Sequence, residues 1–134
     1  MTRLFEIEGI GERYCERLGG CGITTVEDLL ALGATPEGRH ELAERTHLRE
    51  DLILKWIALA DLFRIRGVAE DYAELLERVG ITSLPTLAES NADQLYAELM
   101  QVNETCHVVR NIPHRYQVQS WVAQARELPR VVIY

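Results

Sequence analysis

Several features that the sequence lacks limit what the chain can be. It contains no run of about 18 uncharged apolar residues, the length that a membrane-spanning helix needs. Its first residues lack the basic-then-apolar pattern of a secretory signal, and it has only three cysteines, so we expect a reduced, cytoplasmic protein. Lys55 is the only lysine, and 21 acidic residues outnumber 14 basic ones. The net charge of −7 argues against a general nucleic-acid coat, because non-specific duplex binding depends chiefly on neutralising phosphates.

Two stretches of the sequence repeat each other. Residues 7–30 align without a gap with residues 65–88 at an offset of 58, and the alignment holds 10 identities in 24 positions. Unrelated stretches of average composition would share about one or two. Trp56 aligns with Trp121 at an offset of 65, so the second copy carries about seven extra residues (65 − 58). We predict one domain over residues 1–134, made of repeat 1–64, repeat 65–128 and tail 129–134.

The apolar residues of both repeats follow a helical period. Those of 52–63 have the spacing of a broad apolar helix face, and those of 116–125 follow it more weakly. Helix starts are indicated at Thr25, Thr35 and Ser90, which are residues that cap helices well. The pattern predicts an all-α protein of about ten short helices. The two tryptophans are expected to be core anchors, one closing each repeat.

Neither catalysis nor metal binding is indicated. The sequence contains no Gly-x-Ser-x-Gly, His-Glu-x-x-His, phosphate-loop lysine or kinase signature. Cys15 and Cys21 are six residues apart, which is not the spacing of zinc ligands. They align with Ala73 and Val79, as expected of small core residues. We therefore expect no enzymatic activity, no metal and no cofactor.

Each repeat begins with a short glycine motif. The motif reads Gly-Ile-Gly at 9–11 and Gly-Val-Ala at 67–69, and an apolar residue stands two positions before each. It resembles the helix-hairpin-helix motif, in which a tight turn joins two short helices. Backbone N–H groups at the start of the second helix then point outward and favour an anion. The resemblance implies that this anion is a nucleic-acid phosphate and that paired hairpins straddle a duplex minor groove.

As a whole, the chain resembles a bacterial family of unassigned function built from tandem helix-hairpin-helix repeats. The residues that carry the resemblance run nearly end to end and include 7–11, 25–30, 60–68 and 112–122. The resemblance implies an all-α fold of tandem helix-hairpin-helix repeats, in which two pseudo-symmetric halves share one core. A looser similarity to the C-terminal domain of the bacterial RNA polymerase α subunit points to DNA or protein contacts.

The sequence departs from DNA-binding hairpins just after each turn, where those usually carry Lys or Arg. The first turn is followed by Glu12 and Arg13, and the second by Glu70 and Asp71. Two carboxylates at a helix start are stabilised by the helix dipole and repel a phosphate. The second turn is therefore expected to be self-capped and used for packing. For the first turn, phosphate contact and packing alone both remain open.

Charge distribution favours binding in the last part of the chain. From residue 105 to 134, four arginines stand against Glu127 alone, a net charge of +3. We predict a non-catalytic helix-hairpin-helix module that binds the backbone of duplex or structured nucleic acid. The alternative is a protein-interaction or scaffolding module that has lost nucleic-acid binding and contacts a protein partner or a second copy through the strand-like tail Val131–Tyr134. No membrane partner is expected. The residues expected at the nucleic acid are Gly9, Ile10, Gly11, Arg13, Arg64, Arg66, Gly67, Arg110 and Arg115.

Overall fold

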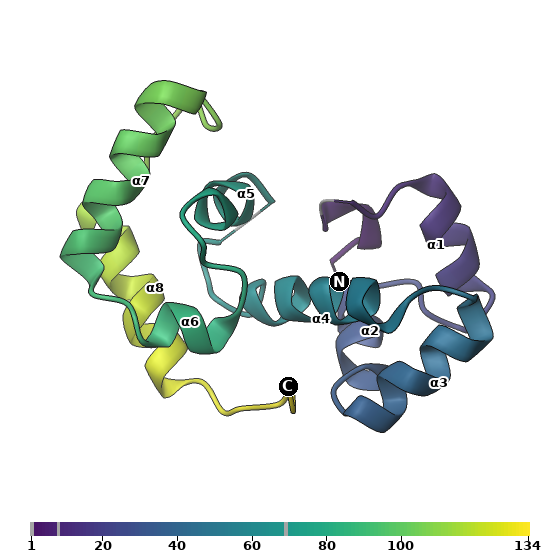
Figure 1. Ribbon diagram of the computed structural model, residues 1–134. Coiled ribbons are helices and arrows are strands. Elements are labelled where there is room, and N and C mark those ends of the chain that lie inside the picture. The colour runs from purple at the N-terminus through teal and green to yellow at the C-terminus, as the bar shows by residue number, and fades with distance from the viewer. Residues whose placement is uncertain (1, 8, 69) are drawn as a thin grey trace. The chain divides into compact units, whose positions relative to one another are not determined.

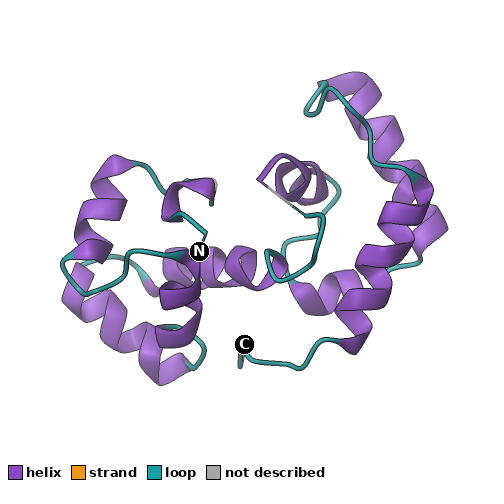
Figure 2. Ribbon diagram, turned by 180° about the vertical axis from the view of Figure 1, so that it is seen from behind, coloured by secondary structure: helices purple, strands orange, loops and turns teal. Residues whose placement is uncertain are grey.

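The computed structural model describes residues 2–7, 9–68 and 70–134 (Figure 1). Within these residues it contains eight α-helices, one 3-10 helix and no strand (Figure 2), so the all-α prediction is confirmed. The elements in chain order are η1 (Leu4–Glu6), α1 (Glu12–Gly19), α2 (Val26–Leu32), α3 (Pro36–Thr46), α4 (Glu50–Leu62), α5 (Glu70–Arg78), α6 (Leu84–Ala88), α7 (Ala92–Cys106) and α8 (Arg115–Glu127).

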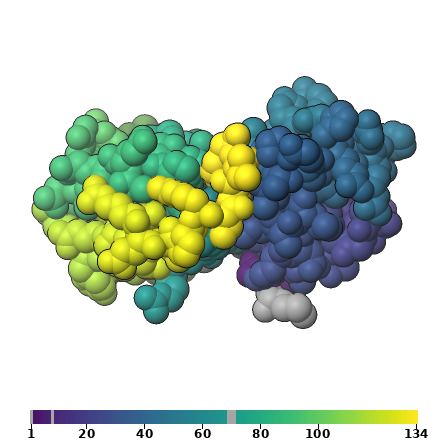
Figure 3. Space-filling model, turned by 90° about the horizontal axis from the view of Figure 1, so that it is seen from below, coloured from purple at the N-terminus to yellow at the C-terminus, as the bar shows by residue number. Residues whose placement is uncertain are grey.

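The chain divides into two compact units. The first unit comprises Met1–Asp61 together with Arg130–Tyr134, and the second comprises Leu62–Pro129. The last five residues therefore pack with the first unit, although α8, which precedes them, belongs to the second (Figure 3). The tail Val131–Tyr134, whose residue types are typical of a strand, forms no strand in the structure.

In the first unit, Trp56 of α4 is 1% exposed, as expected of a core anchor. Thr25 starts α2 through its hydroxyl oxygen, which accepts a hydrogen bond from the Asp28 N–H at 3.1 Å. Thr35 starts α3 in the same way by accepting from the Gly38 N–H at 3.0 Å. Both predicted helix starts are confirmed. The largest fully buried side chains of this unit are Ile7, Leu18, Ile23, Leu29, Ile53, Trp56 and Ile57.

In the second unit, α8 packs against α6 and α7, and α5 packs against α7. Trp121 of α8 is 1% exposed, so the second expected core anchor is also confirmed. The predicted helix start at Ser90 is wrong by one residue. Asn91 caps α7 by accepting from the Gln94 N–H at 3.0 Å. The Ser90 hydroxyl instead donates to the Thr86 carbonyl at 2.9 Å, so Ser90 stabilises the end of α6.

Candidate nucleic-acid interface

The turn before α1 is shaped by Gly9 and held by Ile10. Gly9 has φ +94°, a conformation that side chains other than hydrogen rarely adopt. The Ile10 N–H donates to the Ile7 carbonyl at 3.1 Å, which closes the turn. The Ile10 side chain is 3% exposed, so it anchors the turn in the core of the first unit while Gly9 remains on the surface.

The start of α1 is exposed, and its first residue is Glu12. Gly11 is the residue before the helix and has an extended backbone, and no side-chain oxygen from the described residues caps the N–H groups that follow it. The first N–H groups of a helix have no partner inside the helix and carry its positive dipole end. A Cβ placed on Gly11 would meet no atom within 4 Å, so an approaching ligand finds space there.

Arg13 supplies positive charge at this helix start. Its side chain is exposed and makes no hydrogen bond or ion pair within the described part of the chain. Arg17 is also exposed and equally unpaired there, and it lies four residues later on the same helix face. Arg17 was not predicted from the sequence, although its position four residues after Arg13, about one helical turn, was a usable signal. The first unit thus brings Gly9, Ile10, Gly11 and Arg13 together, with Arg17 one turn away.

The turn before α5 repeats the backbone of the first turn. Gly67 has φ +95°, the Val68 N–H donates to the Ile65 carbonyl at 3.2 Å, and Val68 is buried. The Gln124 amide of α8 clamps the backbone beside the turn: its oxygen accepts from the Arg66 N–H at 2.8 Å, and its nitrogen donates to the Arg66 carbonyl at 3.1 Å. The backbone polar groups of Arg66, beside this turn, are therefore used in packing against α8.

The predicted self-capping of the second turn concerns residues that the structure does not describe in full. Ala69 lies outside the described residues, and so do the side chains of Glu70 and Asp71. That expectation stays a prediction.

The remaining predicted arginines have different environments. Arg64 donates to the Pro129 carbonyl at 2.8 Å, whereas the side chain of Arg66 is exposed. Arg115, at the start of α8, lies 3.4 Å from an Asp93 carboxylate oxygen, and its guanidinium carbon is 5.0 Å from the ring centroid of Tyr96. Arg64 and Arg115 are thus engaged by the protein itself. Arg66 is next to Gly67 and is the second-turn arginine that faces solvent.

Arg110 is exposed on the loop between α7 and α8. The side-chain amide of Asn103 closes this loop, donating to the Val109 carbonyl at 3.0 Å and accepting from the Val109 N–H at 2.8 Å. The Tyr72 hydroxyl of α5 donates to the Asn111 carbonyl at 3.0 Å. The loop that carries Arg110 is therefore tied to the helix that follows the second turn, a proximity that sequence spacing did not reveal.

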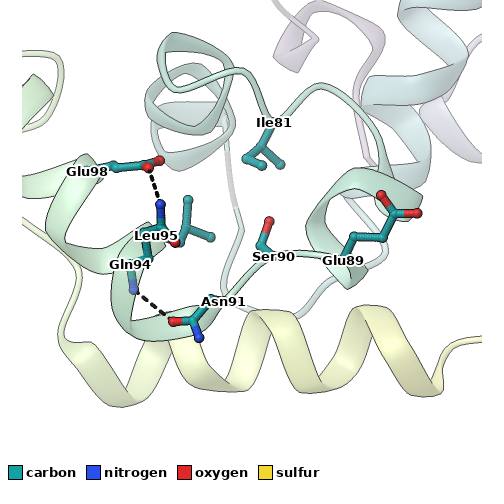
Figure 4. Close-up of a pocket in the computed structure, with 7 residues that line it drawn as sticks. All are labelled: Ile81, Glu89, Ser90, Asn91, Gln94, Leu95 and Glu98. Carbon is teal, nitrogen blue, oxygen red and sulfur yellow. Dashed lines mark hydrogen bonds between the residues drawn. The ribbon is translucent and has the colours of Figure 1, made fainter.

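A pocket of about 240 Å³ between α6 and α7 does not suit a phosphate (Figure 4). Glu89 and Glu98 contribute carboxylates to its lining, and the Gln94 amide nitrogen donates to Glu98 at 3.3 Å. No basic side chain lines it, so its charge is opposite to that of the α1 start. The lining residues are Ile81, Glu89, Ser90, Asn91, Gln94, Leu95 and Glu98.

The cysteines are free thiols, with Cys15 and Cys21 half-buried and Cys106 exposed. Burial and the nearby Glu12 carboxylate raise the pKa of the Cys15 thiol, so it stays protonated at neutral pH. Among the residues that the structure describes, no group of three His, Cys, Asp or Glu side chains could hold a metal ion. None of the described helices has the length and apolar character needed to cross a membrane.

A family model described as "Domain of unknown function (DUF4332)" matches residues 8–128. The chain belongs to this family. The expected membership of a family without assigned function is therefore confirmed. No curated protein and no solved structure matches the chain. The family match spans both glycine turns and all eight α-helices.

Proposed function

We propose that this protein is a tandem helix-hairpin-helix module that binds the nucleic-acid backbone through the turn before α1. The observation that carries the proposal is the start of α1 after Gly11, where, among the residues that the structure describes, no side chain caps the helix and the Arg13 guanidinium has no partner. An unsatisfied helix N-terminus and a cation together favour an oxygen-rich anion such as a phosphate diester.

The local likeness of the two turns supports the tandem part of this proposal. Gly9 and Gly67 differ by one degree in φ, +94° against +95°. The hydrogen bond that closes each turn has nearly the same N–O distance, 3.1 Å at Ile10 and 3.2 Å at Val68. Two related halves with a pseudo-symmetric arrangement are the simplest origin of this likeness.

The two turns are assigned different roles. At the first turn, Gly11 has no side chain, so a phosphate oxygen can approach the N–H groups of α1 while Arg13 pairs with the same or the next phosphate. At the second turn, the Gln124 amide engages the backbone of Arg66, and the exposed Arg66 side chain adds positive charge. We therefore assign the first turn to phosphate contact and the second mainly to packing.

The acidic remainder of the chain limits the affinity. With a net charge of −7, the protein repels nucleic acid everywhere except at local basic sites. Binding is expected to be weak. It is also expected to weaken as salt is added, because each phosphate contact contributes about −0.9 to the slope of log affinity against log salt concentration.

Titration of labelled nucleic acid at low salt, followed by fluorescence anisotropy, tests this proposal. Duplex, branched and single-stranded probes are compared with wild type, Arg13→Glu and Arg49→Glu. Arg49 is a matched control because it is exposed, lies in the first unit and pairs with Asp51 at 3.4 Å. We expect Arg13→Glu to lose at least about tenfold in affinity and Arg49→Glu to lose much less. Absence of binding to all three probes, or equal losses in the two variants, would overturn the proposal.

A further inference from the structure

The segment Arg130–Tyr134, called the tail segment below, is docked in the first unit by backbone and side-chain contacts (Figure 3). The Ile133 N–H donates to the Ala34 carbonyl at 2.8 Å, between α2 and α3. The Val132 side chain is 7% exposed, whereas Ile133 is 62% exposed. Val132 is therefore the buried side chain of the tail segment, whereas Val131 (42%) and Tyr134 (47%) are exposed like Ile133.

A buried arginine holds the backbone of the tail segment. Arg39 of α3 is 5% exposed. Its Nη1 donates to the Gly33 carbonyl at 2.8 Å and its Nη2 to the Ile133 carbonyl at 2.7 Å. Burying a guanidinium is unfavourable unless its donors find acceptors. One of the two acceptors of Arg39 belongs to the tail segment, so an empty site would leave part of this charge unsatisfied.

A buried carboxylate holds the last residue. Asp61 of α4 is 2% exposed, and its Oδ2 accepts from the Tyr134 hydroxyl at 2.9 Å. Burial and the Asp61 carboxylate raise the pKa of the Tyr134 phenol, so this hydroxyl remains a donor across the physiological range. The contact specifies a phenol, because phenylalanine has no hydroxyl to donate.

These contacts define a peptide-binding site, which we call the tail site. It is formed by Gly33, Ala34, Arg39 and Asp61. It accepts an extended peptide whose carbonyl meets Arg39, whose apolar side chain is buried, and whose tyrosine reaches Asp61. The sequence Val-x-Tyr at 132–134 meets all three requirements.

We propose that the tail site also binds the tail segment of a second copy of this chain. The tail segment packs in the first unit but is carried by α8 of the second unit through Leu128 and Pro129. Arg64 holds the Pro129 carbonyl at 2.8 Å, so the tail segment departs from the second unit at an anchored residue. The tail segment of a second copy would make the same hydrogen bonds and apolar contacts as the chain's own tail segment. Exchange of an identical segment between two copies is a low-cost route to a dimer.

Docking within one copy competes with exchange. Because the tail segment is covalently joined to its own copy by a short connection, its effective concentration at its own site is about 1 mM. Wild-type protein is therefore expected to be monomeric when dilute and to exchange only when concentrated. Blocking the contact within each copy should reveal the contact between copies.

A complementation experiment on the full chain separates these states. One copy carries Val132→Asp and Tyr134→Phe, which damage the tail segment and leave the tail site intact. The other copy carries Arg39→Leu, which damages the tail site and leaves the tail segment intact. Sedimentation is expected to show a one-to-one complex in the mixture and monomers for each variant alone. A third copy with Val131→Ala, at an exposed position of the same segment, is the control and should behave as wild type.

Binding of an acetylated peptide with the sequence of residues 130–134 provides the second measurement. It should bind the copy with the damaged tail segment, bind wild type at least about tenfold more weakly because the native segment competes, and not bind Arg39→Leu. Circular dichroism checks that each variant is helical, and Arg39→Lys replaces Arg39→Leu if the latter does not fold.

Three results would overturn the proposal. The first is a mixture of folded variants that stays monomeric at every concentration. The second is a peptide that binds while the mixture forms no complex, which would mean that the site serves only the chain's own segment. The third is dimerisation of either variant alone as strongly as in the mixture, which would place the dimer contact elsewhere.

Discussion

The ring of Tyr14 meets the indole of Trp56 edge-on, with centroids 5.0 Å apart and planes inclined by 62°. Tyr72 and Trp121 form the corresponding pair in the second unit, at 5.3 Å and 49°. Each indole nitrogen also faces the glycine of its own turn, because a Cβ built on Gly9 would lie 3.7 Å from Trp56 Nε1. The glycine of each turn thus packs against a buried tryptophan of the same unit.

The two glycines at positive φ should differ in their tolerance of a methyl group. Replacing either by alanine strains the backbone, at a cost of about 1–2 kcal/mol in the free energy of unfolding. Gly67→Ala should cost more, because its Cβ would lie 3.1 Å from Trp121 Nε1, against 3.7 Å for Gly9→Ala and Trp56. Urea unfolding measures both. Gly11→Ala is the control, because Gly11 has φ −91° and open space, and it should change stability by less than about 0.5 kcal/mol.

Gly11→Ala also separates stability from binding. If the start of α1 contacts phosphate, the added methyl group should weaken nucleic-acid affinity while leaving the urea midpoint unchanged. Unaltered affinity in a folded Gly11→Ala protein would count against a close backbone approach at this position.

Arg126 should stabilise the fold through its hydrogen bonds and not through its positive charge alone. Its Nε donates to the Ala88 carbonyl at 2.9 Å and its Nη2 to the Ser90 carbonyl at 3.0 Å, so it ties α8 to the end of α6. Arg126→Lys keeps the charge but cannot reproduce the forked contact, and we expect a loss of about 1–2 kcal/mol in unfolding free energy. Arg130→Lys is the matched control, and a similar loss in both variants would contradict this role.

His40 should give the first unit a mild pH dependence. Contact with the Glu50 carboxylate, together with Glu44, raises the pKa of His40 above its ordinary value of 6.5. Because the folded state binds the proton more tightly, the stabilisation is present below that value and is lost as pH rises through the raised pKa. Thermal unfolding midpoints between mildly acidic and mildly alkaline pH should therefore fall less in His40→Gln than in wild type. His107→Gln, at an exposed histidine without a carboxylate partner among the described residues, is expected to retain the wild-type pH dependence.

Salt dependence offers a direct count of phosphate contacts. Arg13→Gln should reduce the magnitude of the logarithmic salt slope of binding by about one, because one phosphate contact is lost. Arg64→Gln should change the slope little, since Arg64 is already engaged with the Pro129 carbonyl. A slope that does not change with Arg13→Gln would place the contact on other residues.

Local patterns were sufficient to predict an all-α chain, the core tryptophans and the capping of α2 and α3, but they predicted about ten helices where the described residues contain eight α-helices and one 3-10 helix. These features depend on residues within one or two turns of each other, such as Thr25 and Asp28, whose hydrogen bonds form wherever the helix forms. The cap of α7 was predicted at Ser90 but lies at Asn91. Both residue types can cap a helix, and the Ser90 hydroxyl instead donates to the Thr86 carbonyl.

The sequence alone determined that the chain is all-helical, that it has two glycine turns and that most of its basic residues are arginines. Tertiary structure decided what each long side chain does. Arg39 is buried against the tail segment, 94 residues away in the chain, while Arg13 and Arg66 face solvent. The reason is physical: a guanidinium reaches carbonyl oxygens from distant segments, and only the packed fold brings those oxygens within hydrogen-bonding distance.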